Sequence, residues 1–202
     1  MNEIYNRQKL KAAAKDAIRP SYWMLVLTIL IYSGITGGVA ALSATCLVGL
    51  GNVIDLLLGT PLLIGVLVIF RMSREKKIES SDLSHVFDGF RVNLGRNIGV
   101  GVLMSVYTFL WSLLFVVPGI IKGIGYSMAP WIAIDHPEMT ASQCIAESTK
   151  MMMGHKGEYF VLMLSFIGWA LLSCLTFGIG FLFLAPYVLM SQQLFYWYVS
   201  TR

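Results

Sequence analysis

The sequence predicts an all-α protein, a polytopic bundle of membrane helices in which six spans form three hairpins, each preceded by an interfacial amphipathic helix. The first observation behind this class is composition. Of the 202 residues, 56% are hydrophobic and only 13% are charged, which is about half the charged fraction of an ordinary soluble domain. A soluble core could not bury so many apolar side chains, so lipid is the expected solvent for most of them.

The second observation is that the apolar residues form long stretches. Several approach the roughly 20 residues that a helix needs to cross the hydrocarbon core. They lack the alternation of a transmembrane β-strand, and helices satisfy every backbone group inside lipid. The first stretch is too long for the apolar part of a signal peptide, so we expect an uncleaved span there. The expected spans are 22–44, 53–70, 97–117, 118–134, 158–177 and 179–199.

The third observation is the distribution of Lys and Arg. All of them except Lys122 lie in the N-terminal arm, between the second and third spans, between the fourth and fifth spans, or at the C-terminal end. The remaining connections are tight turns without basic residues. Because basic residues accumulate on the cytoplasmic side of membrane proteins, the pattern predicts cytoplasmic N- and C-termini.

Three of the cytoplasmic segments are amphipathic, and we expect them to form helices in the headgroup plane. The last one opens with Thr140-Ala-Ser-Gln143, a capping-box pattern. Each segment precedes a pair of spans, which suggests an internal repeat within a single membrane domain, 1–202. The amphipathic helices are expected at 3–18, 80–94 and 140–155, and the repeats at 1–70, 78–134 and 138–199.

Lys122 places a charge inside an otherwise apolar run, and three interpretations are open. Its side chain could reach the outer headgroups while its stem stays in lipid. It could instead pair with Asp55, which lies two residues into the second span from the same face, because intramembrane charges usually point into the bundle and find a partner. The third interpretation is a substrate or ion site.

The span that contains Lys122 is also interrupted by Gly119, Gly123, Gly125 and Pro130. Such residues can unwind a helix around a binding site, as they do in transporters. The alternative is close helix packing through small residues, which spaced glycines permit. Small-xxx-small pairs occur at Gly34/Gly38, Gly95/Gly99 and Gly119/Gly123.

Basic residues at the inner ends of the spans are the candidate lipid contacts. Arg96 precedes the third span, and His155 and Lys156 follow Gly154, where we expect the third amphipathic helix to end. Such residues would face the anionic inner leaflet. An ordinary interfacial basic cluster is the alternative to a specific headgroup site.

The sequence offers no signature of catalysis or of a cofactor. Its histidines and cysteines lack the spacing of metal ligands, and no nucleophile, base and orienting group can be assembled. No phosphate-binding loop or dinucleotide fingerprint is present. The basic residues flank apolar runs instead of forming one basic face, which argues against nucleic acid. We therefore expect no metal, no cofactor and no enzymatic activity.

From Pro118 onward the residues resemble a known family. The motifs "PGIIK", "YSMAP", "DHP", "GHK", "LSFIGW", "GIG" and "PY" follow in this order up to residue 187, and the likeness extends upstream through "SDLSHVFDGF". The segment is similar to the bacterial integral-membrane family called domain of unknown function 975. A more distant similarity is to the membrane domain of some glycerophosphodiester phosphodiesterases, whose chemistry belongs to a separate soluble domain.

The resemblance implies a six-span protein of the bacterial cytoplasmic membrane, and it carries no established activity. It also implies that seven residues belong to the family pattern, and they are Lys122, Tyr126, Pro130, Asp135, Gly154, His155 and Lys156. We therefore expect a non-enzymatic membrane module that binds membrane lipids and, as a further partner, another membrane protein or a second copy of the chain. The alternative is a small-solute transporter or channel that uses the broken span around Lys122.

Overall fold

The computed structural model describes residues 7–46, 50–114, 116–176 and 178–201, apart from the side chains at 40, 42–46, 50–56, 114 and 116. Within these ranges every regular element is a helix, so the predicted all-α class is confirmed. In chain order the elements are α1 (Arg7–Ile18), the 3₁₀ helix η1 (Arg19–Ser21), α2 (Tyr22–Cys46), α3 (Leu50–Glu75), the 3₁₀ helix η2 (Ser80–Phe87), α4 (Asp88–Arg91), α5 (Leu94–Leu114), α6 (Val116–Tyr126), α7 (Ala129–Asp135), α8 (Ala141–Met151), α9 (Lys156–Leu164), α10 (Ile167–Leu175) and α11 (Ile179–Ser200).

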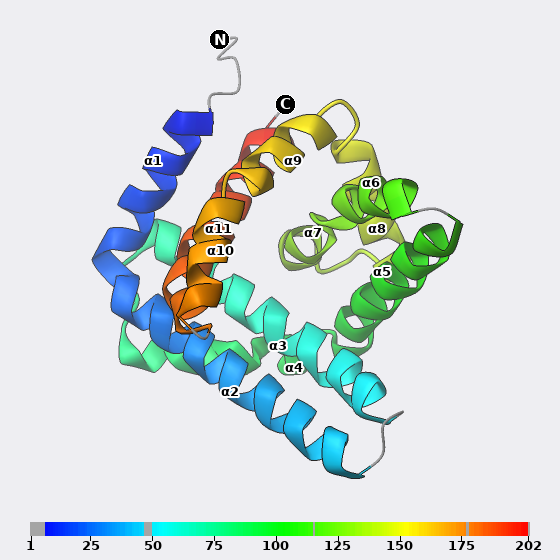
Figure 1. Ribbon diagram of the computed structural model, residues 1–202, viewed down its shortest axis with the longest axis horizontal. Coiled ribbons are helices and arrows are strands. Elements are labelled where there is room, and N and C mark those ends of the chain that lie inside the picture. Colours follow the sequence, from blue (N-terminus) through cyan, green and yellow to red (C-terminus); the bar gives the residue numbers. More distant parts are fainter. Residues whose placement is uncertain (1–6, 47–49, 115, 177, 202) are drawn as a thin grey trace.

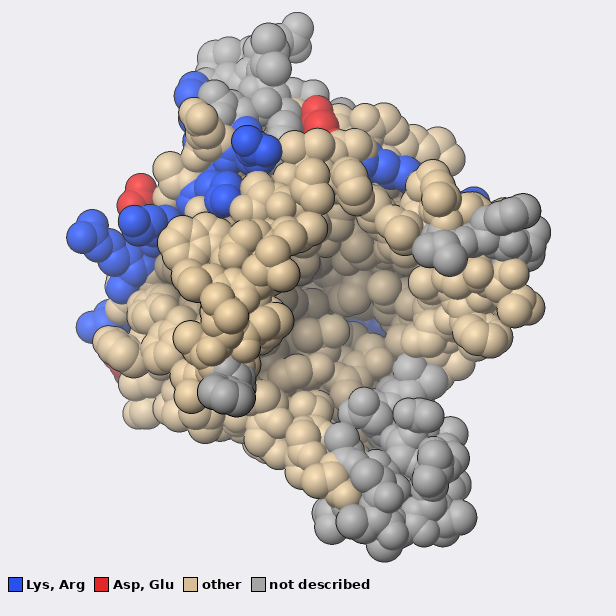
Figure 2. All heavy atoms as spheres, in the orientation of Figure 1, with Lys and Arg blue, Asp and Glu red and all other residues tan. Residues whose placement is uncertain are grey.

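Consecutive helices pack in antiparallel pairs, which are α2 with α3, α5 with α6, and α10 with α11 (Figure 1). Helix α1 lies along α11, so the beginning and the end of the described chain are neighbours. Helices α7 and α8 pack against α5. The pairs diverge, and Figure 2 shows the molecule hollowed between them.

Within the described residues, four helical stretches are long and apolar enough to cross a membrane, and they are 7–39, 57–75, 156–175 and 179–200. The arrangement of six spans in three hairpins stays a prediction. Two of the expected spans are interrupted: 118–134 is divided between α6 and α7 at Ser127 and Met128, and 158–177 is divided between α9 and α10 at Ser165 and Phe166.

The expected amphipathic segments differ in regularity. The third forms α8, and its capping box is present, because the Thr140 N–H donates to Gln143 Oε1 at 2.8 Å and the Gln143 N–H donates to Thr140 Oγ1 at 3.4 Å. Gly154, at φ +83°, follows this helix. The second segment is not one continuous helix, because it is divided into η2 and α4. A capping box also opens η2, in which the Asp82 carboxylate accepts from the Glu79 N–H at 3.0 Å.

Close backbone packing explains how the second segment is held. A β-carbon at Gly65 of α3 would overlap the Val86 carbonyl of η2, and one at Gly89 of α4 would overlap the Pro61 carbonyl of α3. Glycine is therefore required at both positions for η2 and α4 to lie directly on α3. Val86 and Phe70 are completely buried at this contact layer.

The glycines of the small-xxx-small pairs differ in whether they lie close to another helix. A β-carbon at Gly119 would collide with Ser112 of α5, which agrees with close packing of α6 on α5. Gly99 faces Ala141 of α8 at 3.0 Å. Gly34 and Gly38 face open space among the described residues, so the predicted packing role is not seen there.

Candidate functional site

The break between α6 and α7 is closed by a side chain from α8. The hydroxyl of Ser148 donates to the Gly125 carbonyl at 2.7 Å and accepts from the Met128 N–H at 3.2 Å. Ser148 is fully buried, and Tyr126 is nearly so. A backbone that leaves a helix inside an apolar environment needs such partners, and one hydroxyl supplies them for both sides of the break.

Lys122 points toward α5. Its ammonium group lies 4.6 Å from the centroid of the Trp111 ring, which is a cation–π geometry. On the same pair of helices the ring of Tyr126 lies 6.0 Å from that of Tyr107. The side chain of Asp55 lies outside the described residues, so its pairing with Lys122 stays a prediction.

Pro130 is buried in the first turn of α7, where a proline costs no helical hydrogen bond. At the other end of α7, Asp135 joins two further helices. Its carboxylate lies 2.6 Å from a guanidinium nitrogen of Arg71 on α3 and accepts from the Tyr196 hydroxyl of α11 at 2.8 Å. The ring of Tyr196 in turn stacks on Trp131. Pro130 is therefore part of a structural element rather than of an open site.

The predicted lipid-interface residues all have partners within the protein. Arg96 donates to the His136 carbonyl at 3.3 Å, in the turn after α7. His155 lies 2.8 Å from Glu158. The end of the Lys156 side chain lies against Gly125, next to the break in the backbone. The structure thus places the Lys156 side chain beside the α6–α7 break, whereas Arg96 contacts the turn after α7.

Two of the three cysteines have described side chains, and both are free thiols. Cys144 is completely buried on α8, and this burial raises the pKa of its thiol. Cys174 is exposed on α10. The interpretation of Cys144 as a small apolar residue therefore agrees with its surroundings.

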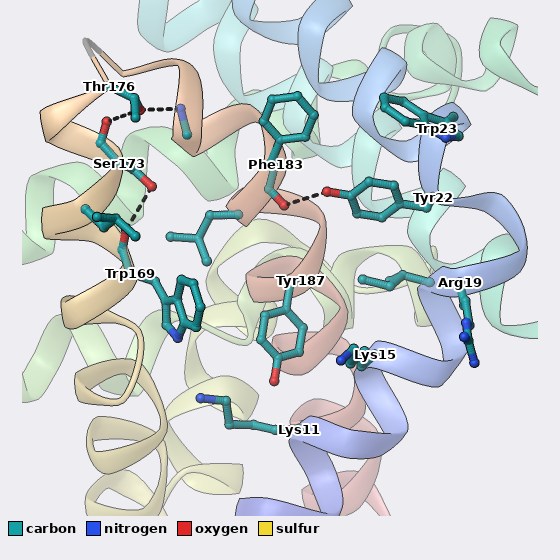
Figure 3. Close-up of a pocket in the computed structure, with 14 residues that line it drawn as sticks. Lys11, Lys15, Arg19, Tyr22, Trp23, Trp169, Ser173, Thr176, Phe183 and Tyr187 are labelled. Atoms are coloured by element: carbon teal, nitrogen blue, oxygen red, sulfur yellow. Dashed lines mark hydrogen bonds between the residues drawn. The ribbon is translucent and has the colours of Figure 1, made fainter.

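Sequence reasoning missed a groove of about 790 Å³ between α1–α2 and α10–α11 (Figure 3). This volume lies within the range of small-molecule sites, about 300–1,000 Å³. Aromatic and aliphatic side chains form its walls, among them Trp23, Trp169, Leu172 and Phe183. Trp23 and Trp169 expose 72% and 58% of their surface, so the groove is an apolar surface that no other described residue covers.

One end of this groove is cationic. Lys11, Lys15 and Arg19 line it, and its described lining contains no Asp or Glu. Figure 3 shows the ammonium groups of Lys11 and Lys15 near the hydroxyl of Tyr187, with the guanidinium of Arg19 turned outward. Figure 2 shows basic side chains gathered over the same side of the molecule.

The sequence contained a signal for this cationic end. Lys11, Lys15 and Arg19 are four residues apart, which places them on one face of a helix. They read only as part of the basic N-terminal arm, because nothing local shows that α10 and α11 lie opposite them. We call the three basic residues and the apolar walls the α1–α11 groove.

In the part of the chain that the structure describes, the fold is all-helical, and four of its stretches are long and apolar enough to cross a membrane. Residues 113–202 match a family model described as "Protein of unknown function (DUF975)". The matched part runs from the end of α5 through α11, so the resemblance seen in the sequence is confirmed there, whereas the similarity to glycerophosphodiester phosphodiesterases is not shown. The comparisons with curated proteins and with solved structures gave no match.

Proposed function

We propose that this chain is a non-enzymatic integral membrane protein that binds membrane lipid, placed in the bacterial cytoplasmic membrane with both termini in the cytoplasm. The observation that carries the proposal is the α1–α11 groove, which joins exposed apolar walls to a cationic end. Phospholipids have the complementary arrangement of acyl chains and a charged headgroup. A basic cluster next to apolar surface is also the pattern of sites that recognise anionic lipids of the inner leaflet.

A transporter or channel built around the broken span is the less favoured alternative. Transporters leave unwound backbone groups available to coordinate their cargo. Here the Ser148 hydroxyl occupies the Gly125 carbonyl and the Met128 N–H, and Lys122 lies over the Trp111 ring. These contacts indicate that the backbone groups at the break bond to the protein itself and are not available to coordinate a solute.

Partners in the membrane are part of the same proposal. The tips of α5 and α6 carry large exposed apolar side chains, including Phe109 at 66% and Leu113 at 73% exposure. Lipid, a second copy of the chain or another membrane protein could cover such a surface. The proposal assigns lipid to the α1–α11 groove and leaves the α5–α6 tips as the protein-facing surface.

The function is tested by asking whether lipid stays with the full-length protein. We expect native mass spectrometry of protein extracted from membranes into mild detergent to show phospholipid retained at a fixed molar ratio. Lys122→Met should leave that ratio unchanged, and vesicles containing the protein should show no solute flux beyond protein-free vesicles. Complete loss of lipid in mild detergent, or a flux that Lys122→Met abolishes, would overturn the proposal.

A further inference from the structure

We infer that the α1–α11 groove holds one anionic phospholipid, with the phosphate beside Lys11 and Lys15 and an acyl chain along the wall formed by Trp169, Leu172 and Phe183. This inference rests on the proposed lipid-binding function and specifies its ligand class and its site. It commits to an intact lipid, because the cationic end and the apolar walls belong to one continuous groove.

Charge is the first argument. Lys11, Lys15 and Arg19 line the groove together, and among the described residues none of them takes part in an ion pair with a carboxylate. Like charges that gather without a counter-charge repel one another, and an anion placed among them removes that cost. The complementary occupant is therefore negatively charged.

Lys11 is the best-positioned of these cations. Its ammonium donates to Ser165 Oγ at 3.2 Å and lies 4.3 Å from the centroid of the Phe166 ring. Ser165 in turn donates to the Leu162 carbonyl at 2.6 Å, which fixes the acceptor. An ammonium group has three N–H donors, so one bond to Ser165 orients Lys11 and leaves donors for a phosphate oxygen.

Three hydroxyls of the wall are already bonded to backbone carbonyls, which leaves this part of the wall mainly apolar. The Ser173 hydroxyl donates to the Trp169 carbonyl at 2.8 Å, and the Thr176 hydroxyl donates to the Ser173 carbonyl at 2.8 Å. The Tyr22 hydroxyl donates to the Phe183 carbonyl at 3.3 Å, as Figure 3 shows. The aliphatic and aromatic side chains between these hydroxyls, among them Leu172 and Phe183, offer hydrocarbon contact to an acyl chain.

The location of the groove relative to the apolar stretches is a further argument. The apolar walls belong to α2, α10 and α11, which lie within three of the stretches able to cross a membrane, 7–39, 156–175 and 179–200. The basic residues lie on α1 and η1, at the polar beginning of the first of them. A lipid bound with its headgroup at α1 would therefore lie at the same depth as the lipids of the surrounding leaflet. Its acyl chains would stay in an apolar environment when it binds.

The test uses the full-length protein, purified in non-ionic detergent and depleted of lipid. It is titrated with dioleoylphosphatidylglycerol, dioleoylphosphatidylcholine or glycerol 3-phosphate, and bound molecules are counted by native mass spectrometry. We expect one phosphatidylglycerol to bind with at least tenfold preference over phosphatidylcholine, and glycerol 3-phosphate not to compete. Equal binding of the two lipids would overturn the inference and leave the proposed lipid-binding function standing.

Matched variants locate the site. Lys15→Gln should weaken phosphatidylglycerol binding about fivefold, as expected when one basic residue near a lipid phosphate is removed, while Lys9→Gln on the same helix should not. Leu172→Trp should fill the groove and reduce binding of the lipid, while Leu171→Trp should not, because Leu171 is also exposed but lies outside the groove lining.

Thermal unfolding of each variant separates loss of binding from loss of fold. If Lys15→Gln and Leu172→Trp unfold at the wild-type temperature and still bind phosphatidylglycerol with wild-type affinity, the lipid binds elsewhere and the inference is wrong. If neither lipid binds the wild-type protein, the proposed function itself fails.

Discussion

Ser148 shows how one hydroxyl can decide the course of the chain. It lies on α8, whereas the groups it contacts, the Gly125 carbonyl and the Met128 N–H, flank the break between α6 and α7. All of this is buried, so water cannot replace the hydroxyl if it is removed. The residue therefore links the amphipathic α8 to the interrupted span.

Replacing Ser148 should cost stability because two buried backbone groups lose a partner. We expect Ser148→Ala to lower the free energy of unfolding by about 1–3 kcal/mol, measured by denaturation of the purified protein in detergent. Ser142→Ala, an exposed serine on the same helix, should change it by less than about 0.5 kcal/mol. Equal stability of the two variants would show that the break does not depend on the Ser148 hydroxyl.

Lys122 and Lys156 illustrate a second lesson at the same scale. In sequence both look like charges that face the membrane or a solute. In the structure Lys122 lies over the Trp111 ring, and the end of the Lys156 side chain lies against Gly125. Both were candidate sites because of their charge and their position along the chain. Their actual contacts are with Trp111 and Gly125, which are not adjacent to them in the sequence.

At the scale of elements, α3 is the helix on which the irregular second segment is built. Pro61 and Gly65 are four residues apart and so share one face, which contacts α4 and η2. Both contacts involve backbone atoms of the neighbouring element, which a small shift of a side chain cannot accommodate. The segment between α3 and α5 therefore packs directly against α3 and does not form a separate interfacial helix.

Gly65→Ala tests this contact. The added methyl group would overlap the Val86 carbonyl, so we expect the free energy of unfolding to fall by about 1–3 kcal/mol or more. Gly34→Ala in α2 meets nothing within 4 Å, and the gain in helix propensity should leave that variant at least as stable as the wild type. Thermal unfolding in detergent compares the two. A Gly65→Ala protein as stable as Gly34→Ala would contradict the close contact of η2 with α3.

At the scale of the whole molecule, Asp135 connects parts that are far apart in the sequence. It is the last residue of α7, pairs with Arg71 near the end of α3 and accepts a hydrogen bond from Tyr196 near the end of α11. Asp135 and Tyr196 lie in the segment that matches the family model, and Arg71 lies outside it. The contact thus joins the matched part of the chain to the part that precedes it.

A double-mutant cycle measures this connection. The coupling energy between Arg71→Gln and Asp135→Asn should be about 1–2 kcal/mol, because the pair is partly buried and Tyr196 holds the carboxylate. Glu147 and Lys150, an exposed pair at 3.8 Å on α8, should couple by about 0–0.5 kcal/mol. Urea or dodecyl sulfate unfolding supplies the four stabilities of each cycle. A coupling of Arg71 with Asp135 no larger than that of the surface pair would show that it does not hold α3 to α7.

Local chemistry accounts for what could be read from the sequence. Apolar runs, few charges and Thr140 with Gln143 are properties of neighbouring residues, and they correctly predicted an all-helical chain, helices able to cross a membrane and the capping box of α8. The motifs after Pro118 likewise predicted the family model that residues 113–202 match. The expected helix over 80–94 is divided into η2 and α4, which pack on the backbone of α3 through Gly65 and Gly89, and local patterns do not reveal such long-range contacts.

The sequence by itself determined that this chain is helical and suited to lipid, because hydrophobicity and helix periodicity are carried by each segment alone. Only the tertiary structure decided that Lys11 and Lys15 line one groove together with Trp169 and Phe183, and that Ser148 closes the break beside Gly125. These contacts join residues that are far apart along the chain, and their formation depends on which helices pack together. That choice follows from the sum of many weak packing contacts, which no local pattern records.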